Sequence, residues 1–189
     1  SLFFLVSCDN EFLEEVHPTR QSADDFFRND AEVQEAVIGM YDYMTELYGR
    51  NGDDFMASFD MLRGDNLTLP RDFGNNNLVQ WLTLNYNAET NKVRDGWQYS
   101  YEAIYRANWI IANVTDNPDI SEGVRNRALG EAHFMRGFAY FNLTRLYGEV
   151  PIVLEPTSLD DLYPEKSSNA ECWTQVISDF ETSLNGLPA

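Results

Sequence analysis

The sequence predicts an all-α fold, an antiparallel array of helical hairpins that carries a long irregular loop as an insert. Three observations predict it. Apolar residues recur three and four positions apart in four stretches, which is the spacing of one helix face. Each stretch is bounded by residues that start and stop helices. Residues 50–90 are instead rich in Gly and Asn and show little periodicity, which predicts a loop.

Composition limits what the protein can bind. The 189 residues suffice for one domain with a core, expected over residues 22–189, and 43 % of all residues are hydrophobic. A formal charge of −18 repels phosphate backbones, so nucleic acid is not expected as a partner. The simpler interpretation of the acidity is a solvated surface, since no segment has the ligand spacing of a calcium loop. We expect no metal and no cofactor.

The first residues have the order of an export signal. The apolar run 2–6 is followed by a small residue, by Cys8 and then by acidic and amide residues. The segment LVSC, residues 5–8, resembles a bacterial lipobox, in which the Cys takes up lipid. We expect residues 1–8 to be a truncated lipoprotein signal with Cys8 as the lipidation site, and residues 9–21 to be a tether. A frayed apolar N-terminus is the alternative.

The first helix is marked by two start signals and one stop. Ser22 with Asp25, and Asn29 with Glu32, each have the spacing of a helix start. Gly49 is expected to end the helix. Its apolar stripe comprises Val33, Val37, Met40, Met44 and Leu47.

The second helix has the most regular pattern, and Asn117-Pro118 closes it. One polar residue, Asn108, falls on its stripe. A buried amide usually hydrogen-bonds a neighbouring group, so we predict a structural role for Asn108 and not ligand binding. The stripe comprises Val93, Trp97, Tyr101, Ile104, Asn108 and Ile111.

The third helix is predicted to be buried on more than one side. Asp119 with Glu122 opens it, and Gly148 ends it so that residues 150–154 leave as extended chain. His133 lies beside a core stripe, and we expect a structural histidine there. Small residues on one face admit a close neighbour, whereas aromatic residues on a second face fill a wider gap. These faces are Val124, Ala128, Ala132, Met135, Ala139, Asn142 and Leu146, and Phe134, Phe138, Phe141 and Arg145.

The fourth helix opens at Ser168 with Glu171 and stops at Gly186 and Pro188. Cys172 is expected to be a small buried hydrophobe. Two-helix repeats of about 34 residues are the tetratricopeptide arrangement, and the spacing from residue 91 to residue 121 is near that value. The array is therefore predicted to be tetratricopeptide-like. The predicted core stripe of the fourth helix is Trp173, Ile177, Phe180 and Leu184.

Four segments match the motifs of a known family. They are CDNEFLEE, AVIGMYDYM, WQYSYEAIYRANWII and EAHFMRGFAYFNLTRLYGEVPIV. The last two match W-x3-Y-x2-I-x-R-A-N and E-A-x-F-x-R-A-x-x-Y-F-x-L-x-x-x-Y-G-x-V-P, with Gly137 where Ala is usual. On these motifs the sequence resembles the SusD/RagB family of Bacteroidetes lipoproteins, which capture nutrients, usually glycans. The resemblance covers the N-terminal third of the family's length, a SusD-like helical N-terminal domain whose C-terminal part is missing.

The resemblance implies a function. It implies a non-catalytic protein, lipid-anchored on the outer face of the outer membrane, that delivers an oligosaccharide to a SusC-like TonB-dependent transporter. It also implies that the loop supplies part of the ligand site, where an aromatic ring would stack on a sugar and polar groups would bind its edges. For Trp81 the alternative is packing of the loop onto the helices. The candidates are Arg71 and Trp81 first, then Asp65, Asn66 and Tyr86, with Arg63 and Asn85 as further polar groups.

Two other classes of function are open to the sequence. A tetratricopeptide-type scaffold would bind peptides or a partner protein, and its acidic surface would suit basic peptides. A glycoside hydrolase is disfavoured, because no feature selects a pair of carboxylates and the histidines, His17 and His133, lack a catalytic context. The ligand could also be a peptide, because relatives of the family take up peptides as well.

Overall fold

The computed structural model describes residues 26–48, 64, 79–80, 82–88, 90–156 and 163–187. Its helices in these ranges include α1 (Asp30–Tyr48), α4 (Asn91–Val114), α5 (Glu122–Tyr147) and α6 (Asn169–Ser183). No strand occurs in the described ranges. The prediction of an all-α fold is confirmed.

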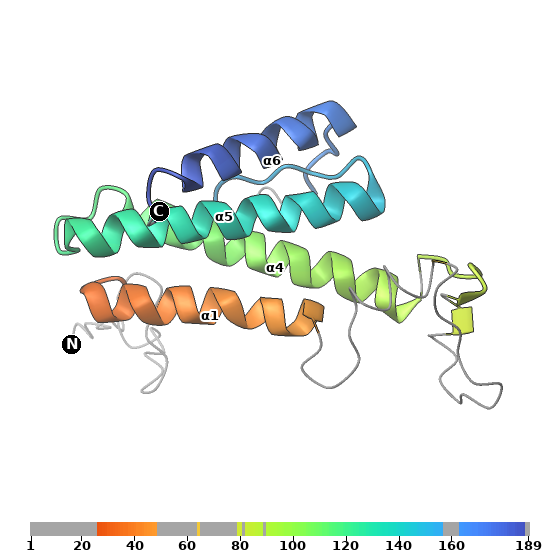
Figure 1. Ribbon diagram of the computed structural model, residues 1–189, viewed down its shortest axis with the longest axis horizontal. Coiled ribbons are helices and arrows are strands. Elements are labelled where there is room, and N and C mark those ends of the chain that lie inside the picture. The colour runs from red at the N-terminus through yellow and green to blue at the C-terminus, as the bar shows by residue number, and fades with distance from the viewer. Residues whose placement is uncertain are drawn as a thin grey trace, which may run out of the picture.

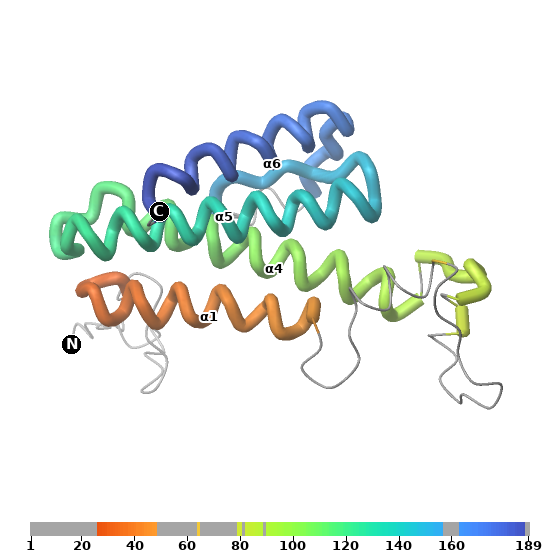
Figure 2. The backbone as a smooth tube through the Cα atoms, in the orientation of Figure 1, coloured from red at the N-terminus to blue at the C-terminus, as the bar shows by residue number. Residues whose placement is uncertain are grey.

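The four helices form a stack with α5 at its centre (Figures 1 and 2). Helix α5 packs against each of the other three, and α1 also packs against α4. The course of the chain shows that α1 and α5 run in the same direction, while α4 and α6 run the opposite way (Figure 2). Two antiparallel hairpins, α1–α4 and α5–α6, therefore stack on one another, which is the predicted tetratricopeptide-like arrangement.

Helix α1 begins as its capping residues predict. The Oδ1 atom of Asn29 accepts hydrogen bonds from two backbone N–H groups of the first turn, at 3.0 and 3.1 Å. These bonds satisfy donors that a helix start leaves open. The Glu32 carboxylate reaches back to the N–H of Arg28 at 2.8 Å. The earlier start predicted at Ser22 and the stop predicted at Gly49 lie outside the described residues.

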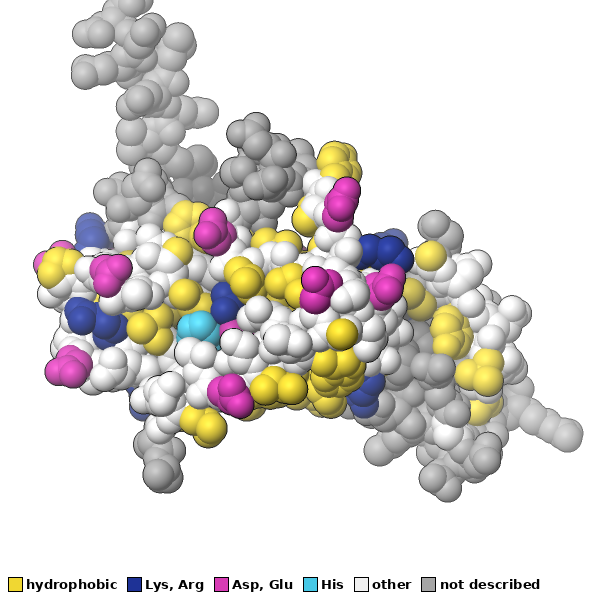
Figure 3. Space-filling model, turned by 90° about the horizontal axis from the view of Figure 1, so that it is seen from above, with side chains coloured by type: hydrophobic (Ala, Val, Ile, Leu, Met, Phe, Trp, Pro, Cys, Tyr) yellow, Lys and Arg dark blue, Asp and Glu magenta, His cyan; other side chains and the backbone are white. Residues whose placement is uncertain are grey.

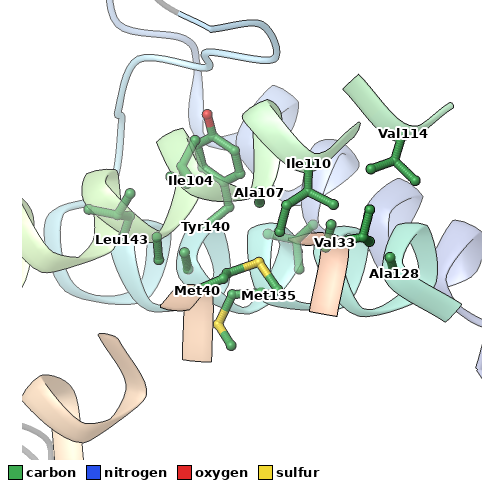
Figure 4. Close-up of a cluster of buried hydrophobic side chains, with 14 of the residues drawn as sticks. Val33, Met40, Ile104, Ala107, Ile110, Val114, Ala128, Met135, Tyr140 and Leu143 are labelled. Atoms are coloured by element: carbon green, nitrogen blue, oxygen red, sulfur yellow. The ribbon is translucent and has the colours of Figure 1, made fainter. Parts of the chain in front are cut away.

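One hydrophobic core joins α1, α4 and α5 (Figure 4). The predicted α1 stripe is confirmed, because Val33, Met40 and Leu47 are buried and Val37 and Met44 pack against the core. Side chains of all three helices meet in Figure 4, so the core forms only when the helices assemble.

Helix α5 starts two residues later than its predicted cap. Its N-cap is Ser121, not Asp119, and Ser121 makes no local capping bond. Its N–H and hydroxyl instead donate to the carboxylate of Asp30 in α1, at 2.8 and 2.6 Å. The N–H of Asp119 donates to Oδ1 of Asn117 at 3.0 Å. Ser121 therefore bonds Asp30, which is 91 residues away, and makes no capping bond within its own helix. The spacing of residues along the sequence does not reveal a partner so far away.

The prediction that α5 is buried between partners is confirmed. Its end is also as predicted: Gly148 has φ 81°, in the left-handed region that favours glycine, and its N–H bonds the carbonyl of Thr144 at 3.0 Å. The buried residues of α5 are Ala128, Gly130, Glu131, Ala132, Met135, Arg136, Gly137, Ala139, Tyr140, Asn142, Leu143 and Thr144.

The start of α6 is confirmed, but its predicted core stripe is confirmed only in part. Ser168 and Glu171 form the predicted capping box. Trp173 and Phe180 are partly buried and pack against the core, whereas Ile177 and Leu184 are 55 % and 75 % exposed. The face turned inward carries two polar residues, whose hydrogen bonds make their burial possible. That face comprises Cys172, Val176, Asp179 and Ser183.

Glycines allow α6 to lie close to α5. A Cβ atom at Gly137 would stand 3.0 Å from Cβ of Asp179 and 3.2 Å from the ring of Phe180. Gly186 follows α6 and sits against the backbone of Gly130, where a Cβ would be 2.9 Å from a backbone atom. The sequence predicts Gly186 as a stop signal, but close approach is what the structure requires of it. Gly137 likewise replaces the family's usual Ala at a crowded contact.

Candidate functional site

The structure describes part of the loop that was predicted to bind ligand. Tyr86 and Asn85 lie within the described residues. The other sequence candidates lie outside them, and so do the tether 9–21 and His17. For these residues the assigned roles remain predictions. The candidates outside the described residues are Arg63, Asp65, Asn66, Arg71, Trp81 and the lipidation site Cys8.

The described loop segment is tied to the start of α4. The N–H of Asn85 donates to the Gln80 carbonyl at 2.9 Å, and Leu84 has φ 55° in the turn between them. The hydroxyl of Thr90, which is buried, accepts from the N–H of Asn87 at 3.1 Å and contacts Oε1 of Gln80 at 3.4 Å. These bonds join the described loop segment to Thr90, the N-cap residue of α4.

This segment lies beyond the N-terminal end of α4, at the end of the stack where α1 and α5 finish (Figure 1). There the Asn85 side chain is exposed and Tyr86 is half-buried. We call this end, formed by the start of α4 and the ends of α1 and α5, the open end of the stack. Most of the residues predicted for the site lie outside the described ranges, so the location of the site remains a prediction.

An aromatic cluster occupies the same end of the stack. The ring of Trp97 lies 4.9 Å from that of Tyr101 and 5.2 Å from that of Tyr147, centroid to centroid. The two hydroxyls donate to the carbonyls of Pro151 and Val93, at 2.7 and 2.6 Å. Burial raises the pKa of both phenols well above the ordinary value. Both rings contact Trp97 and, through their hydrogen bonds, are fixed in position beside it.

Trp97 is a site candidate that sequence reasoning missed. The helical stripe assigned it to the core, but 36 % of the side chain is exposed. Arg94 lies three residues earlier on the same face and pairs with Asp95 at 3.3 Å. An exposed indole with charged groups one turn away can stack on a sugar ring and bind its hydroxyls. The available signal was its place in the second turn of α4, where fewer neighbours cover a side chain.

A second set of polar residues lies in the interior, and we call it the polar cluster: Asn108, His133, Arg136 and Asp179. Arg136 donates to Asp179 through Nη2 at 2.7 Å and through Nε at 3.0 Å. It also donates to Oδ1 of Asn108 at 2.8 Å, and Nδ1 of His133 lies 2.9 Å from Asp179. The side chains of Arg136 and Asp179 are 7 % and 2 % exposed. A ligand could not reach this ion pair without unfolding α6.

The polar cluster holds the extended strap, residues 150–155, against the helices. Asn108 donates to the carbonyls of Val153 and Glu155, at 3.0 and 3.2 Å. The Tyr140 hydroxyl accepts from the N–H of Val153 at 2.6 Å and bonds its carbonyl at 3.0 Å. The predicted structural roles of Asn108 and His133 are confirmed. The motif residues that define the resemblance thus maintain the fold, because they satisfy the backbone of a strap that has no strand partner.

Cys172 also contacts the strap. It is fully buried, and its Sγ lies 3.5 Å from the carbonyl of Val150. The prediction of a small buried residue is confirmed. Its burial argues against a reactive role, since a reactive thiol needs access to its partner.

Neither a spanning helix nor a metal cluster occurs in the described ranges. None of the helices described is long and apolar enough to cross a bilayer. Within the same residues, no three His, Cys, Asp or Glu side chains gather as metal ligands would.

Comparisons with known proteins agree on one family. Residues 11–189 match a family model described as "Starch-binding associating with outer membrane". A SusD-like protein, P25, from Formosa agariphila is 29 % identical over 188 residues, which cover 95 % of this chain and 35 % of the relative. A SusD-like protein from Bacteroides ovatus is 22 % identical and matches 96 % of this chain and 32 % of its own length. The chain thus spans about a third of the curated relatives it matches.

Solved structures share the fold. A laminarin-binding SusD-like protein superposes with a TM-score of 0.74 at 21 % identity, over 86 % of this chain and 35 % of that one. A SusD superfamily protein from Bacteroides thetaiotaomicron gives a TM-score of 0.70 at 27 % identity, over 85 % and 38 %. A structure solved with a xylogluco-oligosaccharide gives 0.69 at 20 %, over 82 % and 30 %.

Proposed function

The chain belongs to the SusD-like family described as starch-binding and associating with the outer membrane, and on this premise we propose that it is a non-catalytic nutrient-binding protein whose ligand is a glycan. The observation that carries the proposal is the family match, which extends over residues 11–189. The helical fold shared with a laminarin-binding protein and with a protein solved with a xylogluco-oligosaccharide supports it.

The open end of the stack suits sugar binding. Trp97 offers a partly exposed aromatic surface, and Tyr86, one of the residues predicted for the site, lies in the described loop segment before α4. Apolar ring faces and a few polar groups at their edges are the usual requirements for such ligands. Arg71 and Trp81, with Asp65 and Asn66, are proposed to complete the site from the loop.

The environment of His133 argues against catalysis. His133, the histidine in the described ranges, bonds a carboxylate that is 2 % exposed. That carboxylate is occupied by Arg136 as well, so neither group is placed to transfer a proton to a sugar. Binding without turnover remains the simplest role for this fold.

Glycan titration tests the proposal. Laminarin and xyloglucan oligosaccharides serve as first probes, and calorimetry of the protein and of Trp81→Ala measures their affinity. We expect the substitution to weaken binding about tenfold, because stacking on a large ring is lost. Tyr105→Ala is the matched control, since Tyr105 is 46 % exposed on α4 but outside the aromatic cluster. The proposal fails if a broad glycan panel shows no binding, or if Tyr105→Ala weakens binding as much.

We further propose that the protein is anchored at the cell surface through a lipid on Cys8 and delivers its ligand to a SusC-like TonB-dependent transporter. The lipobox resemblance and the outer-membrane association of the family support the anchor. Multiple acyl chains hold a protein stably at a membrane, whereas one chain binds marginally. We expect Cys8→Ala to release the protein from the membrane fraction, and its retention there would refute the anchor. Failure of the transporter to co-purify in mild detergent would count against delivery.

A further inference from the structure

A groove between α1 and α5 is left unfilled by the described residues, and its cavity volume is about 370 Å³. Its charged lining residues, Glu131 and Arg127, pair with one another at 2.6 Å. Among the described lining residues no charge is therefore left unpaired, and the groove suits an apolar occupant. The apolar residues that line it are Val33, Val37, Ile38 and Tyr41 of α1 and Val124 and Ala128 of α5.

The groove lies near the point where the N-terminal chain enters α1. Its lining begins in the first turn of both helices, whose starts are joined by the bonds from Ser121 to Asp30 at 2.8 and 2.6 Å. The chain enters α1 through Phe27, which is buried and whose carbonyl accepts from Nδ2 of Asn117 at 2.7 Å. Phe27 has φ 69°, in the left-handed region, so the chain turns there. The chain before residue 26 therefore starts from a fixed point close to the groove.

The predicted tether contains one group of large apolar residues. They are Phe12, Leu13 and Val16, and the residues around them are charged or polar. Phe12 and Val16 are four residues apart, which is the spacing that brings two side chains to one face of a helical turn. The family match begins at residue 11, so it includes this group and leaves out Cys8. The match thus favours a role for the group within the domain over a free tether.

The apolar group can reach the groove. Phe26 follows Val16 by ten residues, which can span up to about 33 Å. The α1 wall of the groove, from Val33 to Tyr41, is eight residues and so about 12 Å long. A segment linked this closely to its site has an effective concentration in about the millimolar range, which favours it over a separate partner.

Charge weighs against a second copy of the chain as the occupant. Helix α1 contains five carboxylates and no Lys or Arg, and a second copy would bring the same acidic helix close to it. The segment around Phe12 is acidic as well, with Glu11, Glu14 and Glu15. Repulsion by α1 therefore opposes its docking too, but the covalent link offsets part of this cost, and a second copy has no such link.

We propose that residues 11–16 dock in the groove, with Phe12, Leu13 and Val16 against its apolar walls, and that this contact holds the domain close to the membrane. The second part rests on the lipid anchor proposed above for Cys8. Phe12 follows Cys8 by four residues, so a docked segment keeps the groove within about 14 Å of the anchor. With a free tether, Phe26 follows Cys8 by 18 residues, which can span up to about 60 Å.

Cysteine labelling tests the docking in the protein in the length in which the cell makes it. Cys8→Ala is present throughout, so the test does not depend on the anchor, and Cys172 is fully buried. With the described residues alone, Ile38 is 69 % exposed and Ile177, the matched position on α6, is 55 % exposed. We expect a maleimide to label Ile38→Cys about tenfold more slowly than Ile177→Cys. Leu13→Ser should remove this difference, because one large apolar contact is lost, and should leave Ile177→Cys unchanged.

The proposal is overturned if Ile38→Cys reacts as fast as Ile177→Cys. It is also overturned if Ile38→Cys is protected and Leu13→Ser does not release it, since another part of the chain would then cover the groove. Protection that is lost on dilution would indicate a second copy and would overturn it as well. A disulfide between Leu13→Cys and Ile38→Cys, which the pair Leu13→Cys and Ile177→Cys does not form, would support it.

Energy transfer tests the membrane part in the lipidated protein. A fluorophore on Glu35→Cys, an exposed position on α1, should transfer energy to a dye in the membrane, and Leu13→Ser should lower the transfer. Unchanged transfer would overturn the membrane part. Retention of Cys8→Ala in the membrane fraction would refute the anchor alone, because the labelling experiment decides the docking without it.

Discussion

The contacts on the two sides of α5 differ in their chemistry. On the α6 side, a buried ion pair and the polar cluster join the helices and the strap. On the α1 side, methionine and aliphatic side chains fill the contact and one groove is left open. Polar contacts fix a single arrangement, since a misplaced buried charge is costly, whereas apolar contacts tolerate small shifts. We infer that the α6 side sets the geometry of the fold and that the α1 side is the more adaptable one.

One cation links α1 to α4. Arg106 donates to the carbonyl of Gly39 at 2.5 Å and to the hydroxyl of Tyr43 at 3.0 Å. Its guanidinium also lies 4.3 Å from the centre of the Tyr43 ring. Unlike Arg136, it is partly exposed and has no carboxylate among these partners. Loss of this cation would leave carbonyl and hydroxyl groups that water can still reach.

Removal of Asp179 is expected to have the largest effect. Asp179→Ala leaves Arg136 buried without its counter-charge, and breaking a buried pair in this way costs about 3–5 kcal/mol of unfolding free energy. Urea denaturation followed by circular dichroism measures the change. Glu181→Ala, an exposed carboxylate on the same helix, is the control and should change stability by less than about 0.5 kcal/mol. Equal effects of the two substitutions would show that the buried ion pair does not stabilise the α6 side, which would contradict the difference inferred between the two sides of α5.

Removal of the α1 clamp is expected to have a smaller effect. Arg106→Met keeps most of the side-chain volume but loses two hydrogen bonds and the ring contact, which together are worth about 1–2 kcal/mol. The same denaturation experiment measures it, and hydrogen exchange should show faster opening of α1 than of α6. If α6 opens first, the polar cluster does not have the role assigned to it.

Acid should weaken the α6 side first. Burial by itself raises the pKa of Asp179, but hydrogen bonds from His133 and Arg136 outweigh it and hold the pKa below its ordinary value. A carboxyl group with a lowered pKa stabilises the fold above its unfolded value, and this stability is lost as the pH falls through the folded value. Wild type should therefore lose its advantage over Asp179→Asn below about pH 4. Denaturation of both proteins across that range measures it, and a constant difference would contradict the assignment.

The surface of α6 shows how far a sequence pattern can mislead. Seen over α6, hydrophobic side chains lie at the surface among charged ones (Figure 3). Ile177 and Leu184 are exposed, although their spacing predicts a core stripe. The buried face one position away carries Asp179, whose burial is possible only because Arg136 lies opposite on α5. Hydrophobic periodicity takes no account of a partner on another helix. The core stripe was therefore predicted one position later than the face that is buried.

The sequence predicted some residues of the candidate site and missed another. The sequence predicted a site in the loop before α4, and of its candidate residues Tyr86 and Asn85 lie in the described segment at the open end of the stack. It assigned Trp97 to the core, because the spacing of a helical stripe is the same whether a neighbour covers its end or not. Tyr147 contacts Val93, so α5 ends level with the start of α4 and leaves Trp97 uncovered on one side. The level at which two helices end is decided by their packing.

By itself the sequence determined the four helices, the starts of α1 and α6, the end of α5 and the identity of the central helix, because periodicity, the Ser168–Glu171 capping box and Gly148 act within a few residues of chain. Only the tertiary structure decided which polar residues are buried, which aromatic residues are exposed and where a groove remains. Those outcomes depend on contacts between residues far apart in the chain, such as Ser121 with Asp30. The free energy of a buried charge or an exposed ring depends on the residues of other helices that pack against it, and a local sequence pattern does not contain them.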